Sequence, residues 1–488
     1  MIIDILRKRT ASCGEHIALQ QEHKRLSYNT MWTFVDRYAE ALNSAGLTSD
    51  DVIPIFASNS VELAIVYLAI WKIGAIPYPF HSDNVEALNY FLISAKAPKA
   101  VLVQKNWSSH KLLWALSRSY SFFPIVGEET LALYVCPSRK GNIGIDLSSK
   151  TAIWISSSST TGPVKTFKLG VQGTLANISA NAESLGLRKE DSTLMWLPMS
   201  YSYGLIGQFL SHLYVGSTIV FPNYNKLIHT AVNLIQQEHI TTLFTIPILL
   251  RSILNIVSIN QGAKSPCSSL RLITIGGGAI DRYNLQRALD LFEHANFAVT
   301  YGLAEAGPRV STYFVRENLH HIGSVGHSIR GVHVKVVDEH RKDVGNEAEG
   351  EIVVFSPSVM QGYVIGSKEE NFIPEKMIYT GDCGYISQDG YLYVLGRKSE
   401  LICTKEHRVY LNEIKELLYS YQDIFYVSIV RDNIEEQNFK LIIHIKLKTK
   451  GHINKDDIFL LLTRRYNFSP ETFVIDISHG LRSDSIKK

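Results

Sequence analysis

Residues 271–280 read RLITIGGGAI, and residues 298–307 read AVTYGLAEAG. Each stretch begins with a short run of apolar and β-branched residues, which predicts a buried strand, and then enters a glycine-containing turn. Further strand candidates lie at 52–56, 100–103, 217–221 and 242–246. Helical patterns, such as those at 26–45 and 61–73, separate strand candidates. This alternation predicts stacked βα units with largely parallel sheets, and hence an α/β fold.

The pattern changes after about Gly331. Short strands separated by turns predict an antiparallel sheet or a small β-barrel-like part over 331–397. From Asn412 onward, two helical and two strand patterns predict a compact α+β domain. We therefore expect a large core at 1–397, whose last part is the β-rich subdomain, and a small C-terminal domain at 398–488.

Composition narrows the class of protein. At 488 residues, 45% hydrophobic and 19% charged, the chain suits a well-buried enzyme of more than one domain. A net charge of +3 without charge runs disfavours nucleic acid as the main partner. The five scattered cysteines lack the spacing of a zinc site, and no apolar stretch is long enough to span a membrane. Together with an N-terminus unlike a signal peptide, this predicts a cytoplasmic location.

Residues 155–166 read ISSSSTTGPVKT. Small hydroxyl side chains, a glycine and a lysine can together supply hydrogen-bond donors and positive charge to a triphosphate. Flanking strand patterns predict a strand–loop–strand hairpin, unlike a P-loop, which opens a helix. Taken alone, the run fits a solvated linker equally well.

This segment resembles the phosphate loop of a superfamily that contains acyl- and aryl-CoA synthetases, peptide-synthetase adenylation domains and luciferases. Thr160, Thr161, Gly162 and Lys165 match its motif, while Ser159, Val164 and Thr166 depart from it. The resemblance implies an AMP-forming adenylating enzyme with a large N-terminal domain and a small mobile lid. It also implies that ATP is bound by Ser158, Ser159, Thr160, Thr161, Gly162 and Lys165.

Two further segments resemble adenine-binding motifs of that superfamily. In TYGLAEAG, the resemblance places Tyr301, Gly302 and Leu303 against the nucleotide, and Glu305, together with Thr161, on Mg²⁺. Ala304 stands where the family has a hydroxyl residue. In GGGAI, it places Gly277, Gly278 and Ala279 along the adenine, although tight packing alone could also explain the glycines.

Residues 377–385, MIYTGDCGY, match the family's Y-x-T-G-D motif. The resemblance implies that Asp382 accepts both ribose hydroxyls, that Gly381 makes a tight turn, and that Arg397 reaches the ribose or phosphate. At the start of the lid, Cys403 and Glu406 replace the usual lysine and glycine. Because that glycine lines the pantetheine route in the family, Glu406 bears on the thioester step.

Residues 197–204, LPMSYSYG, resemble the segment beside the family's acyl pocket. Tyr201 stands at the aromatic position next to the reacting group, and Tyr203, Gly204 and Gly276 complete the expected pocket. Ser202 stands where amino-acid-activating members carry an aspartate. Because a buried ammonium needs a partner, we expect an acid with an uncharged tail rather than an amino acid.

The C-terminal residues LRSDSIKK resemble a worn form of the family's last motif. Lys487 would then be the catalytic lysine that steadies the carboxylate and the α-phosphate, alongside Lys165, Glu305 and Tyr201. A basic, frayed terminus is the alternative.

The resemblance implies that ATP and Mg²⁺ activate a small carboxylic acid to an acyl-adenylate, with release of pyrophosphate. The acyl group would then pass to CoA or to the phosphopantetheine of a carrier protein. Two alternatives remain open: a ligase that works only with a carrier protein, and a catalytically weakened nucleotide- or acyl-binding module.

Overall fold

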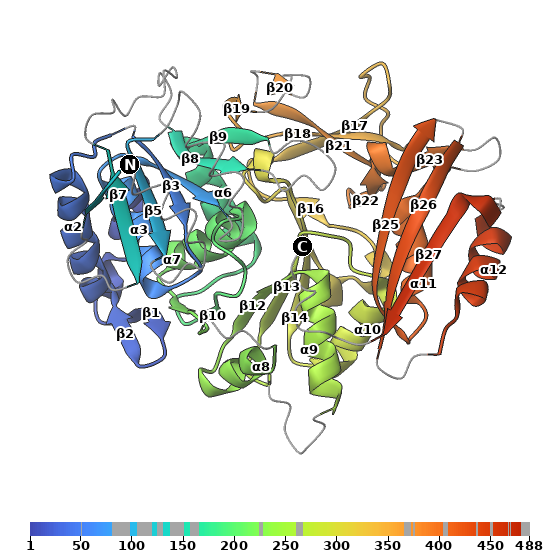
Figure 1. Cartoon of the computed structure of the whole chain (residues 1–488), viewed down its shortest axis with the longest axis horizontal. Coiled ribbons are helices and arrows are strands. Elements are labelled where there is room, and N and C mark those ends of the chain that lie inside the picture. The colour runs from blue at the N-terminus through green and yellow to red at the C-terminus, as the bar shows by residue number, and fades with distance from the viewer. Residues whose placement is uncertain are drawn as a thin grey trace.

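The computed structural model describes residues 1–49, 51–80, 98–104, 120–123, 130–136, 151–156, 165–223, 228–259, 267–365, 372–373, 376–403, 408–435, 438–448, 452–466, 468 and 470–479. The chain runs from the N-terminal sheet on the left of Figure 1 to the C-terminal sheet on the right. The predicted α/β class is confirmed, because sheets and helices alternate along the chain as far as β14.

The largest sheet has nine strands in the order β16-β15-β14-β13-β12-β10-β11-β1-β2. Its central strands, from β14 to β1, run parallel, and strands at both edges run antiparallel. The strands are β1 (Ile17–Gln21), β2 (Lys24–Ser27), β10 (Ser192–Leu194), β11 (Thr218–Val220), β12 (Thr242–Thr245), β13 (Leu272–Ile275), β14 (Asn296–Tyr301), β15 (Ser311–Phe314) and β16 (His327–Ser328).

Both faces of β12 to β14 are covered, which explains their nearly continuous apolar sequences. Ile273, Ile275 and Phe297 belong to one hydrophobic cluster, and Leu272 and Ala298 belong to another. The helices around this sheet are α6 (Val171–Ser184), the π-helix η2 (Tyr203–Leu210), α7 (Ser211–Val215), α8 (Ile228–Gln237), α9 (Pro247–Ile259) and α10 (Arg282–Leu291).

The N-terminal sheet has the order β4-β3-β5-β7-β6. Its strands are β3 (Val52–Phe56), β4 (Ile76–Phe80), β5 (Ala100–Gln104), β6 (Ser121–Phe123) and β7 (Leu131–Val135), and the helices beside it are α1 (Ile2–Arg9), α2 (Tyr28–Ser44) and α3 (Val61–Lys72). The predicted helices at 26–45 and 61–73 are confirmed. Gly46 and Gly74 follow them with φ of 80° and 77°, a conformation that favours glycine.

The predicted hairpin is formed by β8 (Thr151–Ser156) and β9 (Thr166–Gly170). Strand β19 (Gly362–Ile365) pairs with β9, so that Tyr363 lies opposite Phe167. The strand at 362–365, which the sequence analysis placed in the β-rich part, thus belongs to the hairpin's sheet. The remaining strands do form an antiparallel sheet: β17 (His333–Val337), β18 (Gly350–Phe355), β20 (Phe372–Ile373), β21 (Met377–Ile386) and β22 (Leu392–Arg397).

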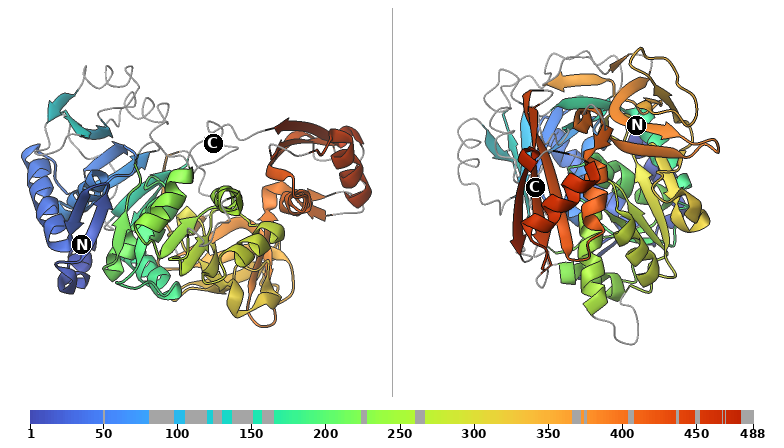
Figure 2. Two further views of the ribbon diagram at one scale, coloured as in Figure 1. Left: turned by 90° about the horizontal axis from the view of Figure 1, so that it is seen from below. Right: turned by 90° about the vertical axis from the view of Figure 1, so that its right-hand side faces the viewer.

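The C-terminal part has its own hydrophobic cluster, built from residues between Ile402 and Ile475. It lies to one side of the larger part (Figure 2). Strand β27 was not predicted; it pairs parallel to β26. The elements are β23 (Leu401–Cys403), β24 (Arg408–Tyr410), α11 (Leu411–Tyr419), β25 (Ile424–Glu435), β26 (Asn438–Leu447), α12 (Lys455–Tyr466) and β27 (Phe473–His479).

A buried polar contact attaches the C-terminal part to α9 and α10. Arg251 forms an ion pair of 2.8 Å with Asp281, and both side chains are buried. The same guanidinium donates a hydrogen bond of 2.9 Å to the hydroxyl of Tyr419, and the backbone N–H of Arg282 donates to Glu416. Breaking this contact would leave a buried charge poorly solvated, so it favours one placement of α11.

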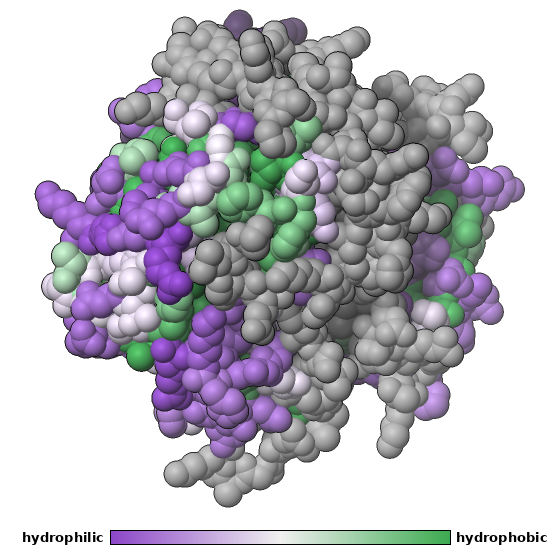
Figure 3. Space-filling model, turned by 60° about the vertical axis from the view of Figure 1, so that its left-hand side comes forward, coloured by the Kyte–Doolittle hydropathy of each residue, from purple (hydrophilic) through white to green (hydrophobic). Residues whose placement is uncertain are grey.

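Among the described residues, no helix is both long enough and apolar enough to cross a membrane. All five cysteines lie in the described part of the chain, and no disulfide joins them. Figure 3 shows hydrophilic residues over much of the described surface on one side of the molecule, with hydrophobic residues gathered beside segments drawn in grey.

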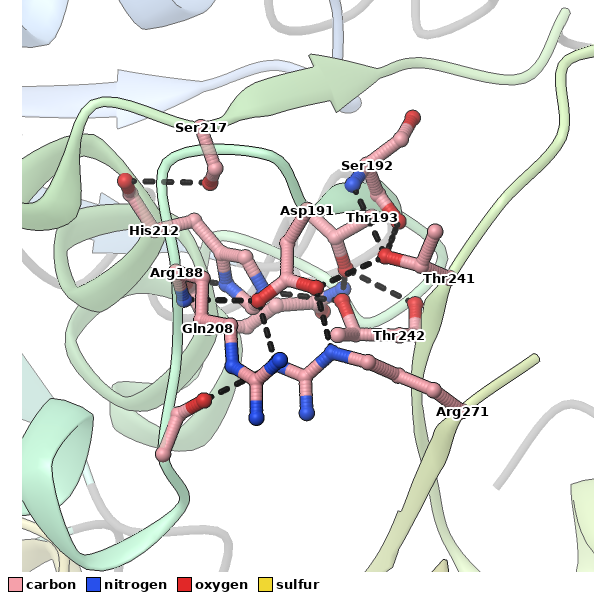
Figure 4. A network of polar contacts seen from close by, with 11 residues as sticks. Arg188, Asp191, Ser192, Thr193, Gln208, His212, Ser217, Thr241, Thr242 and Arg271 are labelled. Carbon is pink, nitrogen blue, oxygen red and sulfur yellow. Dashed lines mark hydrogen bonds and ion pairs between the residues drawn. The ribbon is translucent and has the colours of Figure 1, made fainter. Parts of the chain in front are cut away.

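A polar network lies at the N-terminal ends of β10, β12 and β13 (Figure 4). His212 is completely buried; its Nδ1 lies 2.8 Å from the carbonyl oxygen of Gln208, and its Nε2 lies 2.8 Å from Oγ1 of Thr242. A neutral ring satisfies both contacts, with Nδ1–H donating to Gln208 and Thr242 donating to Nε2. Burial lowers the pKa of His212 to about 4.

His212 should make folding stability depend on pH. In the unfolded chain the imidazole binds a proton near pH 6.5, whereas in the folded chain it stays neutral down to about pH 4. The free energy of unfolding should therefore fall as pH falls through this window, by about 3 kcal/mol at most. Urea unfolding at pH 7.5 and 4.5 should show a smaller loss for His212→Gln than for wild type. His320→Gln, at an exposed histidine, should keep the wild-type loss. An equal loss in His212→Gln would contradict this account.

Candidate active site

The candidate active site lies where β13 and β14 end, which is where parallel sheets commonly bind ligands. Strand β14 ends at Tyr301 and leads into the short 3₁₀ helix η3 (Ala304–Ala306), which carries Glu305. Asp382 on β21 and Arg397 on β22 approach from the β-rich sheet. Lys165 precedes β9. Three of the residues predicted to handle charge, Lys165, Asp382 and Arg397, are thus close enough to shift the pKa of Glu305.

Asp382 is held from three directions. The Tyr301 hydroxyl donates to its Oδ2 at 2.6 Å, Nε of Arg397 lies 3.0 Å from its Oδ1, and its own N–H donates to Oγ1 of Thr380. Burial raises the pKa of Asp382, against the charge of Arg397. A carboxylate offers about four acceptor sites, of which two are used, so two remain for a diol.

The predicted tight turn at Gly381 is wrong. Strand β21 continues through this glycine, and Asp382 pairs in register with Arg397 on β22. The register with β18 shifts between Glu351 and Val353, so the chain forms a bulge, with Gly381 at a φ of 71°. The bulge permits the carboxylate to face Tyr301 without interrupting the strand.

Glu305 is a second carboxylate whose environment disfavours its charged form. Burial raises its pKa, and the charges of Arg397 and Lys165 oppose that shift. The Lys165 ammonium lies 5.7 Å from the ring centroid of Tyr363. Burial and the charge of Glu305 raise the pKa of Tyr363 to about 12. Sequence reasoning missed Tyr363, because only the unforeseen pairing of β19 with β9 brings it to the site.

The glycines after β13 differ from one another. Gly276 is buried, and a Cβ atom built on it would lie 3.0 Å from the ring of Tyr203, so tight packing requires glycine there. Gly277, Gly278 and Ala279 are exposed. Their backbone is therefore available to a ligand. Tight packing thus explains Gly276, whereas the adenine-binding interpretation applies to Gly277, Gly278 and Ala279.

The residues predicted to line the substrate pocket also differ from one another in exposure and packing. Tyr201 is 40% exposed and Ser202 is buried. The hydroxyl of Tyr203 lies 2.9 Å from Oγ1 of Thr274, and its ring contacts Gly276. A Cβ on Gly204 would collide with the carbonyl of Pro198. The π-helix that begins at Tyr203 is a rare element, and such turns are frequent at functional sites.

Several predicted residues lie outside the described part of the chain. They are Ser158, Ser159, Thr160, Thr161, Gly162, Glu406 and Lys487. Their roles stay predictions.

The described residues fit a nucleotide with Mg²⁺. Asp382 has acceptor sites left for a ribose, the 277–279 backbone is open to a base, and two cations face Glu305. Within the described residues, no three His, Cys, Asp or Glu side chains converge as in a protein-only metal site. A magnesium ion on Glu305 would also be bound by phosphate and water, as is common for this ion, and by Thr161 if its predicted role holds.

Comparisons with known proteins identify the family and the fold. The model of the family "AMP-binding enzyme" matches residues 6–364. The chain is 24% identical to 4-coumarate–CoA ligase-like 8 of Arabidopsis thaliana over 83% of the chain and 76% of that protein. It is 25% identical to the 2-succinylbenzoate–CoA ligase of Bacillus thuringiensis subsp. konkukian, over 87% and 84%. The fold is similar to that of the o-succinylbenzoate CoA synthetase MenE of Bacillus subtilis in complex with its acyl-adenylate intermediate. For that pair the TM-score is 0.77 and the identity 19%, over 97% and 94% of the two chains.

Gly302 should not tolerate a side chain. A Cβ atom there would lie 1.8 Å from the backbone carbonyl oxygen of Pro308, so the 301–309 turn would have to move. Gly302→Ala should lower the free energy of unfolding by about 1–3 kcal/mol, as is usual for overpacking. At Gly278 the nearest atom to an added Cβ is 3.7 Å away, so Gly278→Ala should fold like wild type. Chemical denaturation of both variants checks this; equal stabilities would contradict it.

Proposed function

Because the chain belongs to the AMP-binding enzyme family, we propose that it uses ATP to activate a carboxylic acid and then transfers the acyl group to the thiol of CoA. The observation that carries this proposal is the convergence of Lys165, Glu305, Asp382 and Arg397 at the ends of β13 and β14. Relatives named as CoA ligases support CoA as the acceptor.

Adenylation overcomes the poor reactivity of a carboxylate, whose leaving group would be oxide. The acid oxygen attacks the α-phosphorus of ATP, the bond to pyrophosphate breaks, and the acyl carbon gains AMP as a leaving group. Here the protein positions the reactants and neutralises charge. Asp382 would hold the ribose, and the ring of Tyr301, fixed through its hydroxyl, would lie along the base. Lys165 and Arg397 would balance phosphate charge, and a magnesium ion on Glu305 would add to that.

Three further roles belong to this proposal. Lys487 would approach the reacting carboxylate and Tyr201 would border it. The phosphates would be bound by Ser158, Ser159, Thr160, Thr161 and Gly162. The part from 398 to 488 would act as a lid. In this structure the Arg251–Tyr419 and Arg282–Glu416 hydrogen bonds hold α11 against the large part. A rotating lid would have to break both, which would make lid movement a candidate for the slow step.

The acceptor could instead be the phosphopantetheine of a carrier protein. Glu406, at a position that the family keeps small for the pantetheine arm, bears on transfer to either acceptor, because both carry that arm. A cytoplasmic location is also part of this proposal. It is supported by the five cysteines, none of which is in a disulfide, as is usual in a reducing compartment.

Pyrophosphate release should depend on a cognate acid. We expect one or more acids from a panel that includes 4-coumarate and 2-succinylbenzoate to stimulate release, with turnover sustained when CoA is added. Asp382→Ala should raise the KM for ATP at least about 10-fold, since hydrogen bonds to a charged group contribute roughly 1.5–3 kcal/mol each. Asp476→Ala, at a carboxylate exposed on β27, should behave like wild type.

Two results would contradict or redirect this proposal. Folded protein that releases no pyrophosphate with any acid would leave only the binding-module alternative. A single turnover that free CoA cannot extend would point to a carrier protein as the acceptor.

Glu305 should impose a pH dependence on Mg·ATP binding. Because burial raises its pKa, the carboxylate gains a proton at a higher pH than an ordinary glutamate as the solution is acidified. The protonated form cannot hold Mg²⁺, so affinity should fall in that range. Calorimetry from pH 7.5 to pH 5 should show this fall for wild type and for the exposed-site variant Glu183→Gln. Glu305→Gln should bind weakly at every pH; a fall as steep as in wild type would contradict the assignment.

A further inference from the structure

Arg309 is buried and rigidly attached. Its side chain is 3% exposed. Its Nε donates to Oδ1 of Asn181 at 2.8 Å, and its backbone N–H and carbonyl both bond to the amide of Asn177. Its Nη2 is buried without any hydrogen-bond partner. A buried charged group with an unused donor is costly, and such groups are uncommon unless a ligand uses them.

Among the residues that the structure describes, no aspartate or glutamate forms an ion pair with Arg309. Its neighbours are the neutral side chains of Asn177, Asn181 and Tyr203. Arg251, which is buried to a similar degree, has Asp281 as its partner. Arg309 therefore differs from a structural buried arginine of this same chain.

The guanidinium borders the proposed acyl pocket. Its Cζ lies 5.2 Å from the ring centroid of Tyr203, and that ring lies against Gly276. Gly302, which the nucleotide motif contributes, packs on the backbone of Pro308 and Arg309. Arg309 is thus one side chain away from the pocket and on the same turn as Glu305.

Arg309 does not belong to the phosphate-facing charges. Arg397 pairs with Asp382, and the Lys165 ammonium lies over the ring of Tyr363. The Arg309 side chain instead contacts Asn181 and Tyr203. The carboxyl that reacts must lie with the α-phosphate, near the first group. The substrate group that Arg309 would bind therefore lies beside Tyr203, at the end of the acid away from the reacting carboxyl.

We propose that Arg309 binds a second carboxylate of the substrate, at the end away from the carboxyl that reacts, so that the enzyme prefers dicarboxylic acids. This inference rests on the proposed function and names its substrate class. The second carboxylate supplies the missing counter-charge and accepts from Nη2, while Tyr203 closes the side of the pocket. It replaces the sequence-based expectation of an uncharged tail, which considered only the position of Ser202.

Matched acids test the preference. Pyrophosphate release is measured with aliphatic and aromatic dicarboxylic acids of graded length, each beside its monomethyl ester. Wild type should show a kcat/KM at least about 10-fold higher for the best diacid than for its ester, because the ester cannot pair with a buried charge. Arg309→Met should reverse the order, and Arg309→Lys should keep it in weaker form. Arg330→Met, at an exposed ion pair, should leave it unchanged. Equal use of diacid and ester by wild type would overturn the proposal.

Thermal unfolding separates this inference from the proposed function, because it needs no turnover. A diacid alone should raise the Tm of wild type and leave that of Arg309→Met unchanged. Without ligand, Arg309→Met removes both an uncompensated charge and the donor to Asn181, so its Tm serves as the baseline for its own ligand shift. If the diacid shift occurs without pyrophosphate release, the binding site stands and the proposed function fails. If Arg309→Met is several degrees less stable and no diacid shifts wild type, Arg309 is a structural residue and the inference fails.

Discussion

The hydrogen bond from the Tyr301 hydroxyl to Asp382 is the contact on which the site depends. It joins residues 81 positions apart, one at the end of β14 in the parallel sheet and the other in the bulge of β21. Arg397 completes the arrangement from the paired strand β22. Because the two sheets meet there, a surface for the base and an acceptor for the ribose face each other. Substitutions that shift either sheet should therefore alter the affinity for the nucleotide.

Several electrostatic costs lie together at the site. Burial raises the pKa of both Glu305 and Asp382, and Arg309 lies buried with an unpaired donor. Elsewhere, buried charges have partners: Arg251 pairs with Asp281, and Asp191 pairs with Arg271. Unfavourable charges gathered in one place are typical of functional sites, where a ligand supplies the compensation. This contrast, more than any single motif, separates the site from the scaffold.

Local sequence patterns correctly predicted those helices and strands whose bounds depend on neighbouring residues. Strand β3 and helix α3 lie within a residue of their expected bounds, because buried periodicity and a glycine after the helix determine them. Local sequence patterns could not predict which strands pair over long distances. Strand β19 pairs with β9, β27 pairs with β26, and Gly381 lies in a bulge instead of a turn. Among the site residues, motifs indicated Glu305, Asp382 and Arg397. Tyr363 carries no local signal, since only the pairing of β19 with β9 brings it to the site.

The central claim is that this site binds a nucleotide through its ribose at Asp382. Calorimetry of ATP and 2′,3′-dideoxy-ATP binding, with wild type and Asp382→Ala, tests it most directly. The account predicts that wild type binds ATP at least about 10-fold more tightly than the dideoxy analogue, and that the variant binds both equally. Equal binding of the two nucleotides by wild type, or an unchanged preference in the variant, would contradict it.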